Sequence, residues 1–246
     1  MPVNPLVNPL VVRACAVWVE LARVPVSFAP PGGVTVVVSP RSGLCPVGWV
    51  GVVALGGSAV VTAPSEAAAL VVRAALGALP VEAVVDGVSV REVLPVAQVL
   101  GPAALAYVSR SGFRPVEAAG ALGVERLSAA HPDVRGLERA AGPEDAGEAA
   151  LDEMTSPVFA VRDGRGRVIA AAGYEAWPGR AAHVGVLTAP EARGRGLARV
   201  TGSAAVAHAL GAGLLPQWRA RPPASRRVAA ALGFEELGAQ LSIELA

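Results

Sequence analysis

The chain contains no lysine: all 21 of its basic residues are arginines. A Walker-type phosphate loop and a Schiff-base enzyme both need a lysine, so the sequence excludes these two classes. The 20 acidic residues leave a net charge of +1, which removes the electrostatic argument for a nucleic-acid partner. Charged residues make up 17% of the chain and hydrophobic residues 53%, so we expect a globular, apolar fold rather than a disordered chain.

Cysteine and histidine are also scarce. Cys15 and Cys45 form one disulfide at most, and their spacing matches no metal-ligand set. We interpret them as buried residues of a protein in a reducing compartment. The three histidines, His131, His183 and His208, are scattered, so we expect no metal site.

Charge is absent from one long stretch, Ser42 to Ser65, which has the length of a membrane span. Pro46 and the pair Gly56-Gly57 interrupt it, and we predict two short buried strands around a Gly-Gly turn instead. The leading "MPVNPLVNPLVVRA" has no basic leader and places prolines where a signal helix starts. We therefore expect no secretion signal, no membrane partner and a cytoplasmic protein.

The N-terminal half, residues 1–135, has a mixed pattern with no residues that indicate chemistry. It predicts helices over 6–24, 66–79 (with Ser65 as N-cap) and 91–100, and strands over 34–38, 49–55, 59–62 and 102–109. A polar, glycine-punctuated stretch follows, and we place the domain boundary near Gly136.

The C-terminal half, residues 136–246, is more regular. "SPVFAVRD", "VIAAAGYEAW" and "AAHVGVLT" predict three strands joined by tight turns. After them we predict a helix over 194–212, a strand over 214–220, a helix over 224–232 and a final strand over 233–245. This order is typical of an α+β sandwich with a mixed sheet, and it does not match a doubly wound dinucleotide fold.

The long helix is preceded by Arg193-Gly194-Arg195-Gly196. Amide groups at a helix N-terminus lack intrahelical partners and lie at the positive end of the helix dipole. Glycines there let a phosphate reach the backbone, and arginines add charge-assisted hydrogen bonds. We therefore predict a pyrophosphate site. The dinucleotide fingerprint fails, because the loop follows the third strand of a meander and no third glycine is in register.

These residues resemble a known family. "VLTAPEARGRGLA" closely matches the acyl-CoA motif of the GCN5-related N-acetyltransferases (GNAT family): Gln or Arg, two residues, Gly, one residue, Gly or Ala. Here the pattern is Arg193, Gly196 and Ala198. "QWRARPPASRRVAAALGFEELG" resembles the second motif of the family, a strand and a short helix that ends in "LGF". The resemblance spans roughly residues 143–245, and the whole chain is similar to a bacterial subgroup with an extra N-terminal half.

The resemblance implies a GNAT-type mixed sheet with flanking helices and acetyl-CoA as the acyl donor. Backbone groups of one strand would pair with the pantetheine arm, amides of the loop would hold the pyrophosphate, and one serine is retained as a polar contact. The strand residues are Val186, Leu187 and Thr188. The loop residues are Arg193, Gly194, Arg195, Gly196, Leu197 and Ala198, and the serine is Ser225. The family often has an asparagine where this chain has Pro222.

In such enzymes an amine attacks the thioester directly. The positions at which many relatives carry a catalytic acid and a base are Ala229 and Ala182 here. His183 and Glu175 are the remaining candidates, and both also have ordinary structural explanations, so the catalytic residues stay unassigned. The same holds for a wider set of polar and aromatic neighbours: Tyr174, Trp177, His208, Asp152, Glu153, Trp218 and Arg219.

Three functions remain open on the sequence. The first is an N-acetyltransferase that uses acetyl-CoA and a small primary amine. The second is a non-catalytic CoA-binding or sensory module, which the alanines at 182 and 229 favour. The third is a structural domain without a ligand. The N-terminal half is interpreted as a degenerate copy of the same fold, a lid, or a dimerisation element that would make a homodimer.

Overall fold

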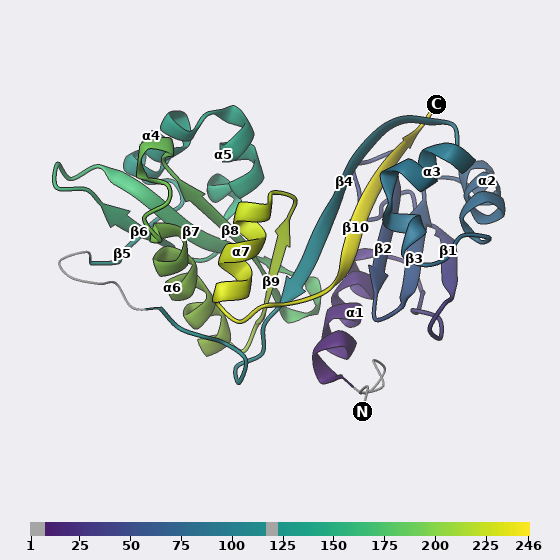
Figure 1. Ribbon diagram of the computed structural model, residues 1–246, viewed down its shortest axis with the longest axis horizontal. Coiled ribbons are helices and arrows are strands. Elements are labelled where there is room, and N and C mark those ends of the chain that lie inside the picture. Colours follow the sequence, from purple (N-terminus) through teal and green to yellow (C-terminus); the bar gives the residue numbers. More distant parts are fainter. Residues whose placement is uncertain (1–7, 117–122) are drawn as a thin grey trace. The chain divides into compact units, whose positions relative to one another are not determined.

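The computed structural model describes residues 8–116 and 123–246, and the chain divides into two compact units (Figure 1). The first unit comprises Met1–Ala106 together with Glu236–Ala246, and the second comprises Tyr107–Glu235. The expected boundary at Gly136 lies instead inside a helix, Pro132–Ala141, which continues through this glycine. The units divide elsewhere because the last strand of the chain belongs to the sheet of the first unit.

The first unit is a mixed α/β structure in which strands follow the order β1-β3-β2-β10-β4. Its helices and strands are α1 (Pro9–Leu21), β1 (Val34–Val38), β2 (Val50–Leu55), β3 (Ser58–Ala63), α2 (Glu66–Leu76), η2 (Ala83–Val85), α3 (Gly87–Val93), β4 (Val96–Tyr107) and β10 (Glu235–Leu245). β2 and β3 are antiparallel, β1 is parallel to β3, and β10 is antiparallel to β2.

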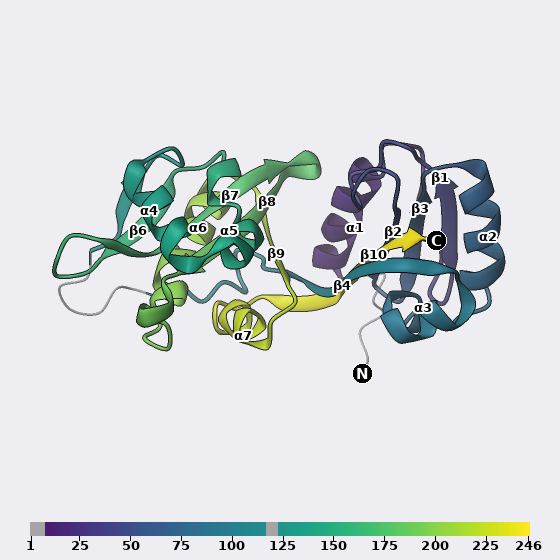
Figure 2. The ribbon, with the colours of Figure 1, turned by 90° about the horizontal axis from the view of Figure 1, so that it is seen from above.

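The uncharged stretch of the first unit forms two strands, as predicted. Every residue of β2 and β3 is buried, and the turn between them places Gly56 and Gly57 at φ of +59° and +83°. Helix α1 packs on β2, whereas α2 packs on β1 and β3 (Figure 2). The core on the α2 side joins Val72 and Leu76 to Leu241 of the returning strand β10.

The prediction of a helix over residues 91–100 is wrong. Asp86 accepts a hydrogen bond from the amide of Ser89 and starts α3 earlier, and α3 ends at Val93, shortly before Pro95. Pro95 cannot continue a helix, so the chain turns into β4. The strand order β1-β3-β2 is not that of the second unit, so it does not favour a degenerate copy, which stays a prediction.

The second unit has the strand order β9-β8-β7-β6-β5. Its elements are β5 (Glu125–Leu127), α4 (Pro132–Ala141), α5 (Pro143–Ala149), η3 (Leu151–Glu153), β6 (Val158–Arg162), β7 (Val168–Trp177), η4 (Pro178–Arg180), β8 (Ala181–Thr188), η5 (Pro190–Ala192), α6 (Leu197–Gly211), β9 (Leu215–Ala220) and α7 (Pro223–Ala231). The three-stranded meander and the strands and helices predicted after it are confirmed, with ends shifted by a few residues.

Alternation along β8 divides the second unit into layers (Figure 1). A Cβ atom built on Gly185 would lie 2.1 Å from the carbonyl oxygen of Ala149, so this side of β8 faces α5. The neighbouring Val186 packs with Phe159 and with Ala205 of α6, so the opposite side faces α6. The sheet therefore lies between α4 and α5 on one face and α6 on the other. This mixed α+β arrangement confirms the predicted fold class.

Three further expectations concern membranes, metals and cysteines. Among residues 8–116 and 123–246, none of the helices is long and apolar enough to cross a membrane. The same residues contain no cluster of His, Cys, Asp or Glu that could hold a metal ion. Cys15 and Cys45 are free and half-buried, and burial raises the pKa of each thiol to about 11. Both thiols therefore stay protonated and unreactive near neutral pH.

Candidate functional site

The parallel strands β8 and β9 pair over only part of their length, and we call the unpaired segment of β8 beyond this pairing the opening. Their pairing runs from Ala181 opposite Leu215 to His183 opposite Gln217, and in the part of the chain that the structure describes it goes no further. β8 continues to Thr188, paired with β7 on its other edge. The edge of β8 that faces β9 is therefore available to an extended ligand from Val184 onward, as in β-strand addition. Three predicted pantetheine contacts, Val186–Thr188, lie in this segment.

The loop at the end of the opening has the geometry of an anion cradle. Gly194 and Gly196 both have a φ of +77°, a conformation that side chains other than glycine rarely adopt. Gly196 is the N-cap of α6 and supplies no side chain to cap it. Within the described residues, the amides of residues 194–198 make no backbone hydrogen bond. Such unpaired amides at the positive end of a 15-residue helix favour an anion.

Arg193 and Arg195, the two arginines of the loop, differ in their surroundings. The Arg193 guanidinium donates to Asp145 Oδ2 at 2.5 Å and to the Thr188 carbonyl at 3.3 Å. Arg195 is exposed, and its side chain makes no hydrogen bond within the described part of the chain. The Thr188 hydroxyl is buried without a partner among the described residues. The loop thus combines unpaired amides with two guanidinium groups.

A polar and aromatic cluster marks the other end of the opening, where β8 and β9 separate. His183 Nδ1 lies 2.5 Å from Gln217 Oε1, and the imidazole stacks on Trp177 at a centroid distance of 4.2 Å. Trp177 Nε1 donates to Glu175 Oε2 at 2.7 Å. The Arg219 guanidinium lies 5.9 Å from the Trp177 ring centroid, a cation–π distance. The structure therefore brings together both catalytic candidates, Glu175 and His183.

The electrostatics of this cluster limit its use in proton transfer. Burial and the nearby Arg219 lower the pKa of His183 to about 3, and the hydrogen bond with Gln217 opposes this shift only in part. The imidazole is therefore neutral at pH 7 and a weak base. The Glu175 carboxylate is already engaged by Trp177.

Gln217 is the member of this cluster that the sequence interpretation missed. It is fully buried, and its Nε2 has no partner among the described residues. A glutamine at the centre of "LPQWRA" is the only local signal, because the pairing of Gln217 with His183 depends on the register of two strands far apart in the chain.

The remaining candidates have structural roles or lie elsewhere. The Tyr174 hydroxyl and His208 Nδ1 are 2.9 Å apart on the α6 face, where burial raises the pKa of Tyr174. Trp218 is buried, and its Nε1–H donates a hydrogen bond to Ser225 Oγ at 2.9 Å. The hydroxyl of Ser225, a predicted cofactor contact, therefore already has a partner within the fold. Asp152 and Glu153 lie in η3.

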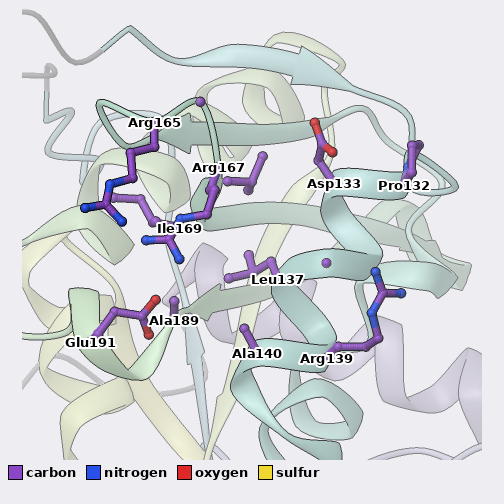
Figure 3. A pocket seen from close by; sticks show the side chains of 13 residues that line it. Pro132, Asp133, Leu137, Arg139, Ala140, Arg165, Arg167, Ile169, Ala189 and Glu191 are labelled. Carbon is purple, nitrogen blue, oxygen red and sulfur yellow. The ribbon is translucent and has the colours of Figure 1, made fainter.

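A separate hollow of about 360 Å³ lies between α4, the turn that joins β6 to β7, and the loop after β8 (Figure 3). Leu137 and Ile169 form part of its apolar lining, and Arg139, Arg165 and Arg167 contribute positive charge. No residue predicted for acetyl-CoA binding or catalysis lines this hollow. It is therefore distinct from the opening between β8 and β9.

Comparison with known proteins identifies the family. Residues 158–239 match the family model described as GNAT acetyltransferase, a range that contains the opening, the cradle loop and the second motif. Residues 158–239 therefore carry the GNAT resemblance, and the family predicted from the two motifs is confirmed. No curated protein matches the chain in sequence.

Solved structures of the same family also resemble the chain. A putative GNAT acetyltransferase from Novosphingobium aromaticivorans is 26% identical, with a TM-score of 0.47 over 60% of this chain and 65% of that one. A GCN5-related N-acetyltransferase from Kribbella flavida is 18% identical, with a TM-score of 0.46 over 59% and 58% of the two chains. This chain thus spans less than two thirds of either. A GNAT superfamily phosphinothricin acetyltransferase from Sinorhizobium meliloti, in complex with AcCoA, is 20% identical, with a TM-score of 0.39 over 51% and 88%.

Proposed function

We propose that this protein is an acetyl-CoA-dependent N-acetyltransferase that transfers the acetyl group directly to a small primary amine. One observation carries the proposal: an unpaired strand edge leads into a glycine loop with unpaired helix-terminal amides, all within the residues that match the family. We also propose that the enzyme acts in the cytoplasm, because Cys15 and Cys45 are free thiols, as suits a reducing compartment.

The residues of the opening fit the parts of acetyl-CoA. The pantetheine arm carries two amides and would lie along Val186–Thr188 as an added strand. The pyrophosphate would lie on the amides of residues 194–198, where a Cβ atom on Gly194 would meet no atom within 4 Å. Arg193 and Arg195 would add charge-assisted hydrogen bonds. The thioester would then lie near the His183–Gln217 pair, where β8 and β9 separate.

The reaction needs no covalent protein intermediate. The amine nitrogen lone pair attacks the thioester carbonyl carbon, the tetrahedral intermediate collapses, and the C–S bond breaks to release the CoA thiolate. The amine loses one proton and the thiolate gains one. The protein contributes mainly by holding the reactants in line. If His183 donates its Nδ1–H to Gln217, its Nε2 is a free acceptor, but its low pKa leaves water as the main carrier of the amine proton.

The second candidate function is a CoA-binding module without catalysis. The observations that favour it are the weak basicity of His183, the engaged carboxylate of Glu175, and the buried alanines Ala182 and Ala229 at the family positions for base and acid. Both candidates share the cradle loop, so they differ in turnover and not in binding.

Isothermal titration with acetyl-CoA tests the shared part. Micromolar affinity, about −8 kcal/mol, is expected for the unmodified chain. Gly196→Asp should abolish binding, because it places a carboxylate in the cradle at a φ of +77°. Gly164→Asp is the control, since it adds the same charge in the turn before β7, where a Cβ atom has open space. Absence of binding to the unmodified chain would overturn both candidates.

Release of free thiol in the presence of an amine panel then separates the two candidates. Amine-dependent thiol release supports the transferase. Tight binding of acetyl-CoA with thiol release no faster than in buffer supports the binding module instead. The same assay with longer acyl-CoA esters reports how the acyl end of the site limits the donor.

A further inference from the structure

Two ion pairs tie helix α5 to the two sides of the opening. Asp145 Oδ2 lies 2.5 Å from the Arg193 guanidinium, and Glu148 Oε1 contacts the Arg221 guanidinium. The two carboxylates are three residues apart on α5, so they project from the same side of the helix. One short helix thus neutralises an arginine from the β8 side and an arginine from the β9 side.

Both arginines lie at the edge where the cofactor phosphates are expected. Arg193 follows the end of β8 in the cradle loop, and Arg221 comes directly after the last residue of β9. β8 and β9 are parallel, so their carboxyl ends lie at the same edge of the sheet. The unpaired amides of residues 194–198 begin at this edge too.

The position of α5 is set by backbone packing as well as by charge. The Ala149 carbonyl at the end of α5 lies against Gly185 in the middle of β8. We therefore expect the helix to stay on β8 when its ion pairs are broken, so that its carboxylates act as internal anions beside the opening.

We propose that Arg221 is a second phosphate-binding residue of the acetyl-CoA site, and that Asp145 and Glu148 occupy Arg193 and Arg221 until the cofactor phosphates displace them. This inference rests on the proposed function. Arginine suits the exchange, because its planar guanidinium binds carboxylate and phosphate with the same forked geometry.

Solvent exposure makes the exchange feasible. The side chains of Arg193 and Arg221 are 51% and 47% exposed, and those of Asp145 and Glu148 are 47% and 40% exposed. Exposed ion pairs of this kind contribute little to stability, and salt weakens them further. A pyrophosphate carries more negative charge than one carboxylate and also binds the helix amides. It should therefore displace Asp145 and Glu148 from the two arginines.

The test measures binding of acetyl-CoA and of S-acetylpantetheine, which has the arm and thioester but no phosphate. Arg221→Gln should weaken acetyl-CoA binding about tenfold and leave S-acetylpantetheine binding unchanged. Asp145→Asn/Glu148→Gln should tighten acetyl-CoA binding about two- to fivefold at low salt. Glu144→Gln on the same helix and Arg165→Gln in the turn before β7 are matched controls, and neither should change the affinity.

Each result has one meaning. If Arg221→Gln leaves acetyl-CoA affinity unchanged, or weakens both ligands equally, Arg221 does not bind a phosphate. If the double variant does not tighten binding, the carboxylates do not compete with the cofactor. Either result overturns this inference. The proposed function is unaffected if the unmodified chain binds acetyl-CoA and Gly196→Asp does not. If the unmodified chain binds no acetyl-CoA, the proposed function fails, and this inference fails with it.

Discussion

His183 stays uncharged in the folded chain at pH values where most histidines carry a proton. Its pKa falls from 6.5 to about 3 through burial and the charge of Arg219. The unfolded chain binds a proton near pH 6.5 that the folded chain does not accept until about pH 3. The free energy of unfolding should therefore be fully retained above pH 6.5 and should fall as the pH decreases toward 3.

Urea unfolding at pH 7 and pH 5 measures this effect. We expect His183 to account for about 1 kcal/mol of the loss between these pH values, after allowance for its partial exposure. His183→Asn should therefore lose about that much less stability over the same interval than the unmodified chain. Equal losses in the two proteins would show that the imidazole is protonated in the folded state, and His183 would then regain its place as a candidate base.

The contact between α5 and β8 depends on the absence of one side chain. A Cβ atom on Gly185 would lie 2.1 Å from the Ala149 carbonyl oxygen and 2.5 Å from Met154 Cε. Gly185→Ala should therefore push α5 away from the sheet and lower the free energy of unfolding by about 2 kcal/mol or more. Because α5 carries Asp145 and Glu148, both ion pairs at the opening should be disturbed as well.

Denaturant unfolding of Gly185→Ala checks this prediction, with Gly164→Ala as the control. A Cβ atom on Gly164 meets no atom within 4 Å, so the control should change stability by less than about 0.5 kcal/mol. A Gly185→Ala protein as stable as the control would mean that α5 does not pack closely on β8.

Each of the two units has a large core of its own, and the last strand completes that of the first unit. Leu241 and Ile243 of β10 are fully buried with residues of β2, β3 and α2. Leu137 of α4 is buried in the other core. Leu241→Ala should therefore speed amide hydrogen exchange mainly in β2 and β3, and Leu137→Ala mainly in β6 and β7, each with a stability loss of about 2–5 kcal/mol.

Mass-spectrometric hydrogen exchange on both variants provides the comparison, and each variant is the control for the other. Faster exchange throughout the chain in both proteins would contradict the division into two units, since it would show that all strands open together. A pattern confined to each core would support it.

The elements that the sequence predicted correctly are those specified by neighbouring residues. The meander from β6 to β8 consists of apolar segments separated by turn residues, and the hydroxyl of Ser65 caps α2. The misplaced helix over 91–100 also had local evidence against it, because Pro95 ends α3 and Asp86 starts it.

The sequence by itself determined the cradle, because two glycines at positive φ and the helix that follows them lie within a few residues of one another. The tertiary structure decided which residues surround that loop. The pairing of His183 with Gln217, the contact of α5 with Arg221, and the return of β10 to β2 join positions distant in the chain. These depend on strand register and on packing of helices against sheets, and no local pattern of residues specifies either.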